Sequence, residues 1–368
     1  MVNASWTPLY VVNKKVRPPS EIYAWEMHQF KPHAAKPEDK GIVVPPSRNL
    51  LGAQMCAWEQ RQEIELPSLR GRLPAMAERV WTVKDALDWT VEYLGRKGDE
   101  HPRRSAEWLL SSATGLSRVE LYAYHDRPLS PEERERYRTL VARRAEGLPL
   151  QYVTGEMPFR HLVVRVEPGV FIPRPETEVL VDVVLEHIQS QAEPRVVDLC
   201  TGSGCVAVSI AHEHPGARVW AVELGRAAFD AACRNALHVG VSDRVQVLYG
   251  DLFDPLPAEL LGNVDFIVSN PPYIPSADLP DLPAEVLGFE PHEALDGGFD
   301  GLDVYRRIIA GAERWLAPGG GLAVELDSGR VADAAAMLRA EYEGVTVRKD
   351  LTGRDRLVYA RKGRAMQP

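Results

Sequence analysis

The chain has 368 residues, of which 45% are hydrophobic and 26% charged, which is enough apolar content for one large domain or two to three smaller ones. Its formal net charge of −9 argues against a protein that mainly binds nucleic-acid backbones, because that task needs a basic face. The sequence shows no 18-residue apolar run and no signal peptide, so we expect no membrane contact and a cytoplasmic location. The cysteines form no C-x-x-C pair and no histidines cluster at ligand spacing, so we expect reduced thiols and no metal site.

Residues 1–80 are rich in proline and irregular, with "RPPSEIY", "KPHAAKPEDKG" and "VVPPSRN" among their segments. Short apolar runs alternate there with turn-forming residues, and they do not add up to a core of their own. We therefore expect an irregular N-terminal segment that does not fold independently.

Residues 81–150 have the periodicity of helices. Thr82 is a candidate N-cap before "VKDALDWTVEYLGRKG", and Gly115 ends the helical stretch "HPRRSAEWLLSSAT". A third helix starts at Ser130 as N-cap with Pro131 in the first turn, and it carries acids early and arginines late. This zone predicts a small all-α domain. We expect it to serve for docking a substrate, although no single residue in it identifies a contact.

Residues 195–362 alternate short apolar runs with helical stretches, after a linker hairpin and entry helix at 151–194 and before a tail at 363–368. The expected strands are "RVVDLC", "RVWAVE", "RVQVLYG", "VDFIVSN", "GLAVEL" and "LVYARK". Strand–helix alternation at this spacing predicts an α/β fold with a parallel, doubly wound, Rossmann-like sheet.

The stretch "VVDLCTGSGC" places a strand, an acid, a small-residue loop and a helix in order. Gly202 and Gly204 would let the backbone approach a ligand, and Glu223 ends the next strand, where a nucleotide ribose is held in such folds. A glycine-rich turn also occurs for packing alone, and the pattern is not that of dinucleotide sites. It resembles the first motif of S-adenosylmethionine-dependent methyltransferases, D-x-G-x-G-x-G, with Cys200 in place of the first glycine.

The segment "IVSNPPYIPS" ends the fourth expected strand of this domain on an amide, two prolines and an aromatic ring. A planar nitrogen is a poor nucleophile, and the Asn270 side-chain oxygen with the Pro271 carbonyl could bind its two hydrogens in line with a methyl donor. Tyr273 could stack on the flat group, and the prolines would keep the turn rigid. The alternative is an ordinary Asn-Pro turn. Enzymes that methylate glutamine, adenine in DNA or guanine in RNA share this motif, so it indicates the reaction better than the substrate.

Further segments narrow the choice of substrate. "PLQYVTGEMPFRHLVVRVEPGVFIPRPETEVLVD", "DLCTGSG", "SNPPYI" and "FEPHEALDGGFDGLDVYRRI" together resemble the bacterial release factor glutamine methyltransferases of the PrmC/HemK family. The resemblance covers roughly residues 81–362. It implies a class I methyltransferase that methylates the glutamine of the Gly-Gly-Gln motif in class-one peptide-chain release factors, with S-adenosyl-L-methionine as the donor.

The same resemblance implies a set of site residues. Those that would cradle the methionine part of the donor through backbone groups are Cys200, Thr201, Gly202, Ser203 and Gly204. Glu223 would hold the ribose hydroxyls, and Leu252 would pack on the adenine where some relatives have tryptophan. Those that would hold the glutamine amide are Asn270, Pro271, Pro272 and Tyr273, and Asn270 would also lie against the donor.

Two stretches extend or depart from the family pattern. Arg174, Glu176 and Thr177 of "IPRPETE" would lie by the donor pocket, or else form only a charge-paired helix start. In "VELDSGRVADA" Glu325 is kept, whereas Asp327 and Arg330 replace the usual glycine and glutamine, which leaves the shape of that loop open.

The N-terminal segment has a different resemblance. "NLLGAQMCAWEQRQEIELPSLRGRLPAMAERVW" is similar to the end of the catalytic barrel of family-20 β-N-acetylhexosaminidases, where Trp58 and Glu59 would contact a sugar. Only part of a barrel is present and the catalytic acid pair is missing, so we expect no glycosidase activity.

Three functions remain in competition at this point. The first is methylation of release-factor glutamine, and the second is amino-methylation of a nucleic acid, which requires a basic strip and a pocket for a flipped base. The third is a non-catalytic cofactor-binding or sugar-binding protein.

Overall fold

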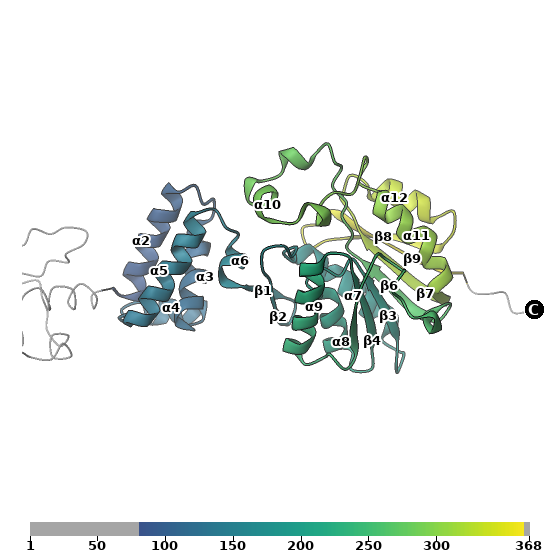
Figure 1. Ribbon diagram of the computed structural model, residues 1–368, viewed down its shortest axis with the longest axis horizontal. Coiled ribbons are helices and arrows are strands. Elements are labelled where there is room, and N and C mark those ends of the chain that lie inside the picture. Colours follow the sequence, from purple (N-terminus) through teal and green to yellow (C-terminus); the bar gives the residue numbers. More distant parts are fainter. Residues whose placement is uncertain (1–80, 364–368) are drawn as a thin grey trace, which may run out of the picture. The chain divides into compact units, whose positions relative to one another are not determined.

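The computed structural model describes residues 81–363 and divides them into two compact units between Glu146 and Gly147 (Figure 1). The expectations for residues 1–80, including Cys56, Trp58 and Glu59, and for the tail at 364–368 lie outside the described residues. Within residues 81–363 no helix is both long and apolar enough to cross a membrane.

The first unit is helical, as expected. Its helices are α2 (Val83–Arg96), α3 (Pro102–Thr114), α4 (Arg118–Ala123) and α5 (Pro131–Ala145). Capping boxes at Thr82 and Ser130 confirm the expected starts, and Gly115 ends α3 with a φ of 74°. Helix α4 was not predicted, although Ser117 forms a third capping box before it. Six residues are too few to show an amphipathic period.

The second unit begins with α6 (Leu150–Thr154) and a hairpin of β1 (Glu156–Phe159) and β2 (Leu162–Arg165). Its main sheet contains seven strands in the order β5-β4-β3-β6-β7-β9-β8. These strands are β3 (Arg195–Leu199), β4 (Arg218–Glu223), β5 (Val245–Tyr249), β6 (Val264–Ser269), β7 (Leu316–Glu325), β8 (Glu343–Lys349) and β9 (Asp355–Arg361). The finer division at residues 150 and 194 stays a prediction.

The sheet is mixed, which corrects the expectation of a parallel one. Strands β5, β4, β3, β6 and β7 run parallel, whereas β9 is antiparallel to both β7 and β8. Strand β8 was not expected because most of its side chains are exposed. It therefore lacks the apolar run that marks a central strand. Because β8 was not expected, its antiparallel pairing with β9 was not expected either.

Helices cover both faces of the sheet. The helical segments of the second unit after β2 are η2 (Pro175–Thr177), α7 (Glu178–Ile188), α8 (Cys205–Glu213), α9 (Arg226–Val239), η3 (Ala258–Leu260), η4 (Leu279–Asp281), α10 (Ala284–Phe289), η5 (His292–Ala294), α11 (Asp303–Trp315) and α12 (Val331–Leu338), of which α7, α8, α9, α11 and α12 pack on the sheet. Helices α7, α8 and α9 lie along one face in Figure 1. The arrangement is the doubly wound one that strand–helix alternation predicts.

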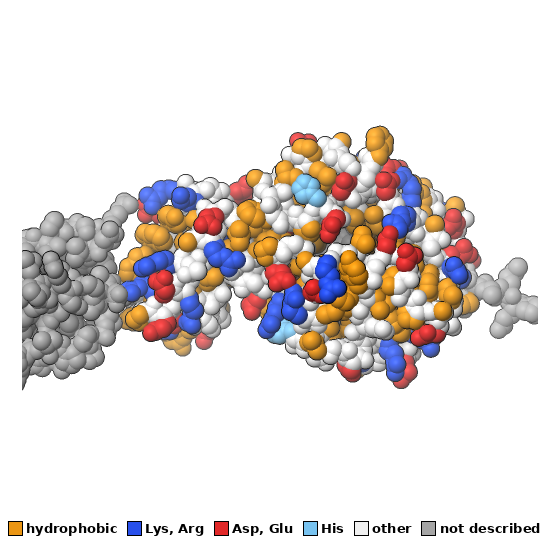
Figure 2. All heavy atoms as spheres, in the orientation of Figure 1, with side chains coloured by type: hydrophobic (Ala, Val, Ile, Leu, Met, Phe, Trp, Pro, Cys, Tyr) orange, Lys and Arg blue, Asp and Glu red, His pale blue; other side chains and the backbone are white. Residues whose placement is uncertain are grey.

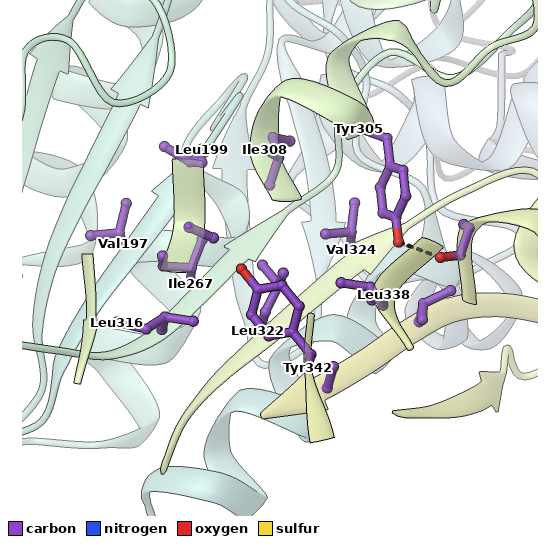
Figure 3. Packing of buried hydrophobic residues seen from close by; sticks show 14 of the residues in the cluster. Val197, Leu199, Ile267, Tyr305, Ile308, Leu316, Leu322, Val324, Leu338 and Tyr342 are labelled. Atoms are coloured by element: carbon purple, nitrogen blue, oxygen red, sulfur yellow. Dashed lines mark hydrogen bonds between the residues drawn. The ribbon is translucent and has the colours of Figure 1, made fainter. Parts of the chain in front are cut away.

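Neighbouring residues of one strand show how the two faces are filled. On β6 the ring of Phe266 packs edge-on against His187 of α7, with ring centroids 5.1 Å apart. The next residue, Ile267, belongs to the core cluster on the other face, with Ile308 of α11 and Leu338 of α12 (Figure 3). Successive side chains of a strand point to opposite faces, so both faces of a central strand must be apolar.

Candidate active site

A cavity lined by loops of the second unit opens at the carboxyl ends of the parallel strands. Its volume is about 540 Å³, and residues that follow β3, β4, β5 and β6 line it. The sheet order reverses between β3 and β6, because β4 and β5 continue to one side and β7 to the other. Ligands of open α/β sheets bind at such a switch point. The two motifs singled out in the sequence follow these two strands directly.

The loop after β3 carries the first motif. Cys200, Thr201, Gly202 and Ser203 line the cavity, whereas Gly204 does not. Gly204 precedes α8 with a φ of 79°, and a Cβ there would lie 3.1 Å from the Ala232 side chain. Gly204 therefore allows the loop to pack closely against α9.

Cys200, which stands where the motif has its first glycine, adopts a strained backbone conformation. Its φ is 56°, in the left-handed region that favours glycine and costs a residue with a Cβ roughly 1–2 kcal/mol. Burial raises the pKa of its thiol above the ordinary value. The side chain is therefore a neutral thiol.

Glu223 ends β4, and its carboxylate connects two loops of the site. Its carboxylate accepts a 2.7 Å hydrogen bond from the Gly202 backbone N–H and one of 2.8 Å from the Gly225 N–H. Burial raises the pKa of this carboxyl, and the two N–H donors oppose the rise. Each oxygen keeps a second lone pair with which it could accept a hydroxyl.

Asp198 of β3 is almost fully buried beneath the same loop. It accepts a 2.5 Å hydrogen bond from the Thr201 hydroxyl, which closes the turn that follows the strand. Burial raises the pKa of Asp198 to about 7, against the lowering effect of that hydrogen bond.

The second motif continues from β6 along the cavity wall. Asn270, Pro271, Pro272 and Tyr273 all line the cavity. The Ser269 hydroxyl donates a 2.8 Å hydrogen bond to the Leu199 carbonyl, which joins the ends of β6 and β3. The Asn270 side-chain N–H donates to the Thr177 hydroxyl oxygen at 3.1 Å. Its Oδ1 has no donor among the described residues, so it is free to accept one from a ligand.

Leu252 lies in the loop that follows β5. It lines the cavity and is 7% exposed, and its expected packing on the adenine stays a prediction. Its φ is 45°, so this loop, like the one at Cys200, holds a side chain in the left-handed region. Nothing in the sequence signalled this conformation.

The segment "IPRPETE" contributes two of its three singled-out residues to the cavity lining, Arg174 and Thr177, whereas Glu176 lies outside it. The Arg174 guanidinium forms an ion pair with Glu290, whose side chain is 2% exposed. Glu290 also accepts a 3.2 Å hydrogen bond from the Ile172 backbone N–H. This pair joins segments 116 residues apart, and neither partner could be matched to the other from the sequence.

The stretch with departures from the family pattern forms a regular turn. Asp327 accepts a 2.8 Å hydrogen bond from the Gly329 backbone N–H, and Arg330 precedes the first turn of α12. Glu325, at the end of β7, is 1% exposed, and its Oε2 has no hydrogen-bond partner within residues 81–363. Burial raises the pKa of Glu325 to about 7.

Acidic side chains outnumber basic ones around the cavity. The charged residues of its lining are Asp198, Glu223, Asp251, Glu293, Asp296, Arg174 and Arg307. Arg174 is paired with Glu290, and Arg307 donates to Asp251 at 2.7 Å, so both cations are already matched. The cavity suits a ligand with positive charge better than a phosphate chain.

Comparison with known proteins decides the family. Residues 85–155 match the PrmC N-terminal domain and residues 161–281 the Methyltransferase small domain. A "Release factor glutamine methyltransferase" of Geobacter sulfurreducens is 46% identical over 285 residues, which cover 77% of this chain and 98% of that protein. The chain belongs to the release factor glutamine methyltransferase family.

Other members of this family and one solved structure complete the comparison. The release factor glutamine methyltransferase of Moorella thermoacetica is 44% identical over 285 residues, 76% of this chain and 99% of that protein. Among solved structures, the hMettl16 catalytic domain is 19% identical with a TM-score of 0.44, covering 63% of this chain and 81% of that chain.

The family matches begin at residue 85 and so do not reach the N-terminal segment. The resemblance of that segment to hexosaminidases, with Trp58 and Glu59 as sugar contacts, is not supported by these findings. The release factor glutamine methyltransferase resemblance of residues 81–362 is supported by both domain matches and by the relatives.

Proposed function

We propose that this protein transfers a methyl group from S-adenosyl-L-methionine to the side-chain amide nitrogen of the glutamine in the Gly-Gly-Gln motif of class-one peptide-chain release factors. One observation carries the proposal: the Cys200–Gly204 loop and the Asn270–Tyr273 motif follow adjacent strands, and both contribute to the lining of one cavity. The family relatives named for this activity support the substrate. Such a reaction belongs in the cytoplasm, where release factors act.

The donor side of the cavity fits S-adenosylmethionine. The Gly202 loop would face the methionine part and Glu223 the ribose hydroxyls, while Leu252 would pack on the adenine. The excess of acidic side chains in the lining favours a sulfonium cation. When bound, the donor supplies a methyl group on positively charged sulfur, so no metal is required for its transfer.

The acceptor side is formed by Asn270 and Pro271. The free Asn270 Oδ1 and the Pro271 carbonyl oxygen would accept the two N–H groups of the glutamine amide. These acceptors hold the nitrogen in one position and favour its pyramidal, more nucleophilic form. Pro271 and Pro272 keep the turn rigid, and the half-buried Tyr273 ring would pack on the flat amide.

The charge distribution favours a protein substrate over a nucleic acid. Methylation of a flipped base requires a basic strip beside the cavity to bind phosphates. The lining contains two arginines and both are paired with acids. Basic and acidic side chains alternate on the face of residues 147–363 visible in Figure 2, with no strip of one sign.

The test is methyl transfer from labelled S-adenosylmethionine to three acceptors: a purified release factor, the same factor with its Gly-Gly-Gln glutamine replaced, and mixed DNA and RNA. We expect label on the intact factor alone. Asn270→Ala should reduce transfer at least about 100-fold, comparable to loss of a transition-state hydrogen bond, while donor binding persists. Label on nucleic acid would overturn the proposal, and unchanged transfer by Asn270→Ala would remove Asn270 from the reaction.

A further inference from the structure

Exposed apolar side chains of the second unit gather at the edge of the sheet that carries the cavity. The large hydrophobic side chains of residues 147–363 that are exposed are Val163, Leu224, Leu237, Tyr249, Phe299 and Leu351. Leu224 and Tyr249 lie at the carboxyl ends of β4 and β5, and Leu351 follows β8, which runs parallel to those strands. Phe299 lies between β6 and α11, in a turn at the same edge. Single exposed hydrophobic side chains are ordinary, whereas their concentration beside a cavity indicates a binding face.

Phe299 is the most exposed of these residues, at 91%. It lies at the tip of a turn whose shape is fixed by hydrogen bonds on both sides. On one side Asp296 accepts a 2.9 Å hydrogen bond from the Gly298 backbone N–H, and on the other Asp300 accepts one of 3.2 Å from the Leu302 N–H. A turn already held in one conformation loses little entropy when it binds a partner. The aromatic ring is thus presented to solvent by a preorganised turn.

The same turn packs against the motif that would hold the substrate amide. The Ser276 backbone N–H donates a 2.9 Å hydrogen bond to the Gly298 carbonyl. A Cβ on Gly297 would lie 2.7 Å from the Cα of Tyr273, the last residue of that motif, so the two backbones are in direct contact. Phe299 is two residues from Gly297, and consecutive Cα atoms are about 3.8 Å apart, so the Cα atoms of these two residues are at most about 7.6 Å apart.

We propose that Phe299 is a docking residue for the protein substrate, whose chain packs on the exposed ring beside the glutamine that enters the cavity. This inference rests on the proposed function for the identity of that chain. The reacting glutamine remains attached to its backbone, and its neighbours within three positions lie within roughly 10 Å of it. That length is comparable to the separation of Phe299 from the acceptor motif. Aromatic side chains are enriched at the centres of protein interfaces, where they contribute much of the binding free energy.

The charges beside Phe299 favour a polypeptide over a nucleic acid. An exposed aromatic ring can also stack on a base, but a nucleic acid brings its phosphates with it. Residues 296–306 contain three acids, Asp296, Asp300 and Asp303, and one base, Arg306. Arg306 is ion-paired with Asp300 and, at 3.0 Å, with Asp303. The net negative charge of this segment repels phosphates and suits a chain with basic side chains near the glutamine.

Steady-state kinetics of the full-length protein with an intact release factor test the docking role. Phe299→Ala should raise the KM for the factor about tenfold, the loss of one interface anchor, with kcat within about twofold of wild type. Phe299→Trp keeps an aromatic ring and should hold the KM within about threefold of wild type. Leu237→Ala is the matched control and should leave the KM unchanged. Leu237 is 68% exposed on α9, near the end that leads to the start of β5 at the opposite edge of the sheet.

A binding measurement without chemistry provides the second readout. Isothermal titration of the release factor into protein loaded with S-adenosylhomocysteine, the donor without its methyl group, gives a Kd in the absence of transfer. Phe299→Ala should raise this Kd about tenfold, whereas the Kd for S-adenosylhomocysteine itself should stay within about twofold of wild type. A structural role of the ring would instead weaken both.

The outcomes distinguish this inference from the proposed function. Lack of methyl transfer to the release factor by the wild type would refute the proposed function. Transfer by the wild type, with Phe299→Ala matching Leu237→Ala in KM and Kd, would refute the docking role alone. A fall in kcat of Phe299→Ala at unchanged KM would also overturn it, because the ring would then act on the acceptor motif. So would a wild-type dimer that Phe299→Ala dissociates, because a second copy of the chain would then cover the ring.

Discussion

The Glu223 carboxylate accepts a 2.7 Å hydrogen bond from the backbone N–H of Gly202, so the end of β4 fixes the loop that follows β3. The same carboxylate accepts from Gly225, the residue before α9. A single buried acid thus connects the loop of the first motif with the start of the next helix. The ribose-binding role expected of Glu223 would therefore be combined with a role in holding the donor loop.

Replacement of Glu223 by glutamine should weaken donor binding. The amide can accept one of the two N–H groups through its oxygen, but its own N–H group would face the other donor. We expect the Kd for S-adenosylmethionine to rise at least about tenfold, because hydrogen bonds to a charged acceptor contribute about 1.5–3 kcal/mol. Isothermal titration calorimetry measures this directly. Glu186→Gln, which alters an exposed ion pair on α7, should leave the Kd unchanged.

Cys200 offers a test of backbone strain. Cys200→Gly should raise the free energy of unfolding by about 0.5–1 kcal/mol relative to Cys200→Ala, since glycine avoids the left-handed penalty but loses more entropy on folding. Both variants lack the thiol and differ only in the Cβ, so their comparison isolates the strain. Urea unfolding of the two proteins provides the measurement. Equal stabilities would show that the φ of 56° costs nothing at this position.

Because Glu290 of the Arg174–Glu290 ion pair is buried, we expect the removal of Arg174 to destabilise the protein. Arg174→Ala would leave the Glu290 carboxylate, which is 2% exposed, with the Ile172 backbone N–H as its remaining donor. We expect the free energy of unfolding to fall by about 1–3 kcal/mol, the cost of an under-satisfied buried charge, discounted because Arg174 is partly exposed. Arg348→Ala, which removes an exposed ion pair with Glu186, should change it by less than about 1 kcal/mol. A result in which both variants behave alike would contradict the assignment.

Asp198 predicts a pH dependence of stability. Its pKa is raised from 3.8 to about 7 in the folded protein, so the folded state binds the proton more tightly than the unfolded state does. The contribution of Asp198 is therefore fully present below pH 3.8 and is lost as pH rises through about 7. Asp198→Asn cannot ionise, and relative to wild type it should become more stable between pH 4 and 7, by at most about 4 kcal/mol.

Urea unfolding at several pH values tests the Asp198 prediction. The difference between the two proteins, rather than either curve alone, reports this group, because other carboxyls also titrate. Asp350, for example, has its pKa lowered to about 2 by the Thr352 hydroxyl, so it acts in the opposite direction. A difference between Asp198→Asn and wild type that stays constant from pH 4 to 7 would show that Asp198 ionises normally.

Much of the fold and the site could be read from local pattern. The capping residues Thr82 and Ser130 indicate where their helices begin, because each cap and its N–H partner lie only three residues apart. The apolar runs of β3 and β6 predicted buried strands, and the motifs that follow them had to meet once these strands were parallel neighbours. The elements that were not predicted include the short helices α4, α6 and α10, which span too few residues to show a period, and the exposed strand β8.

The sequence by itself determined the fold class, the family and the presence of Asn270 and Glu223 at strand ends, because each of these depends on residues close together in the chain. The tertiary structure alone decided which distant groups act on one another. Thr177 meets Asn270 across 93 residues, and Arg174 meets Glu290 across 116. Such pairs produce no periodic pattern in the sequence, since many other acids or amides of the chain could form the same hydrogen bond. The packing of α7 against β6 brings the first pair together, and the second pair forms where the end of α10 meets the residue before η2.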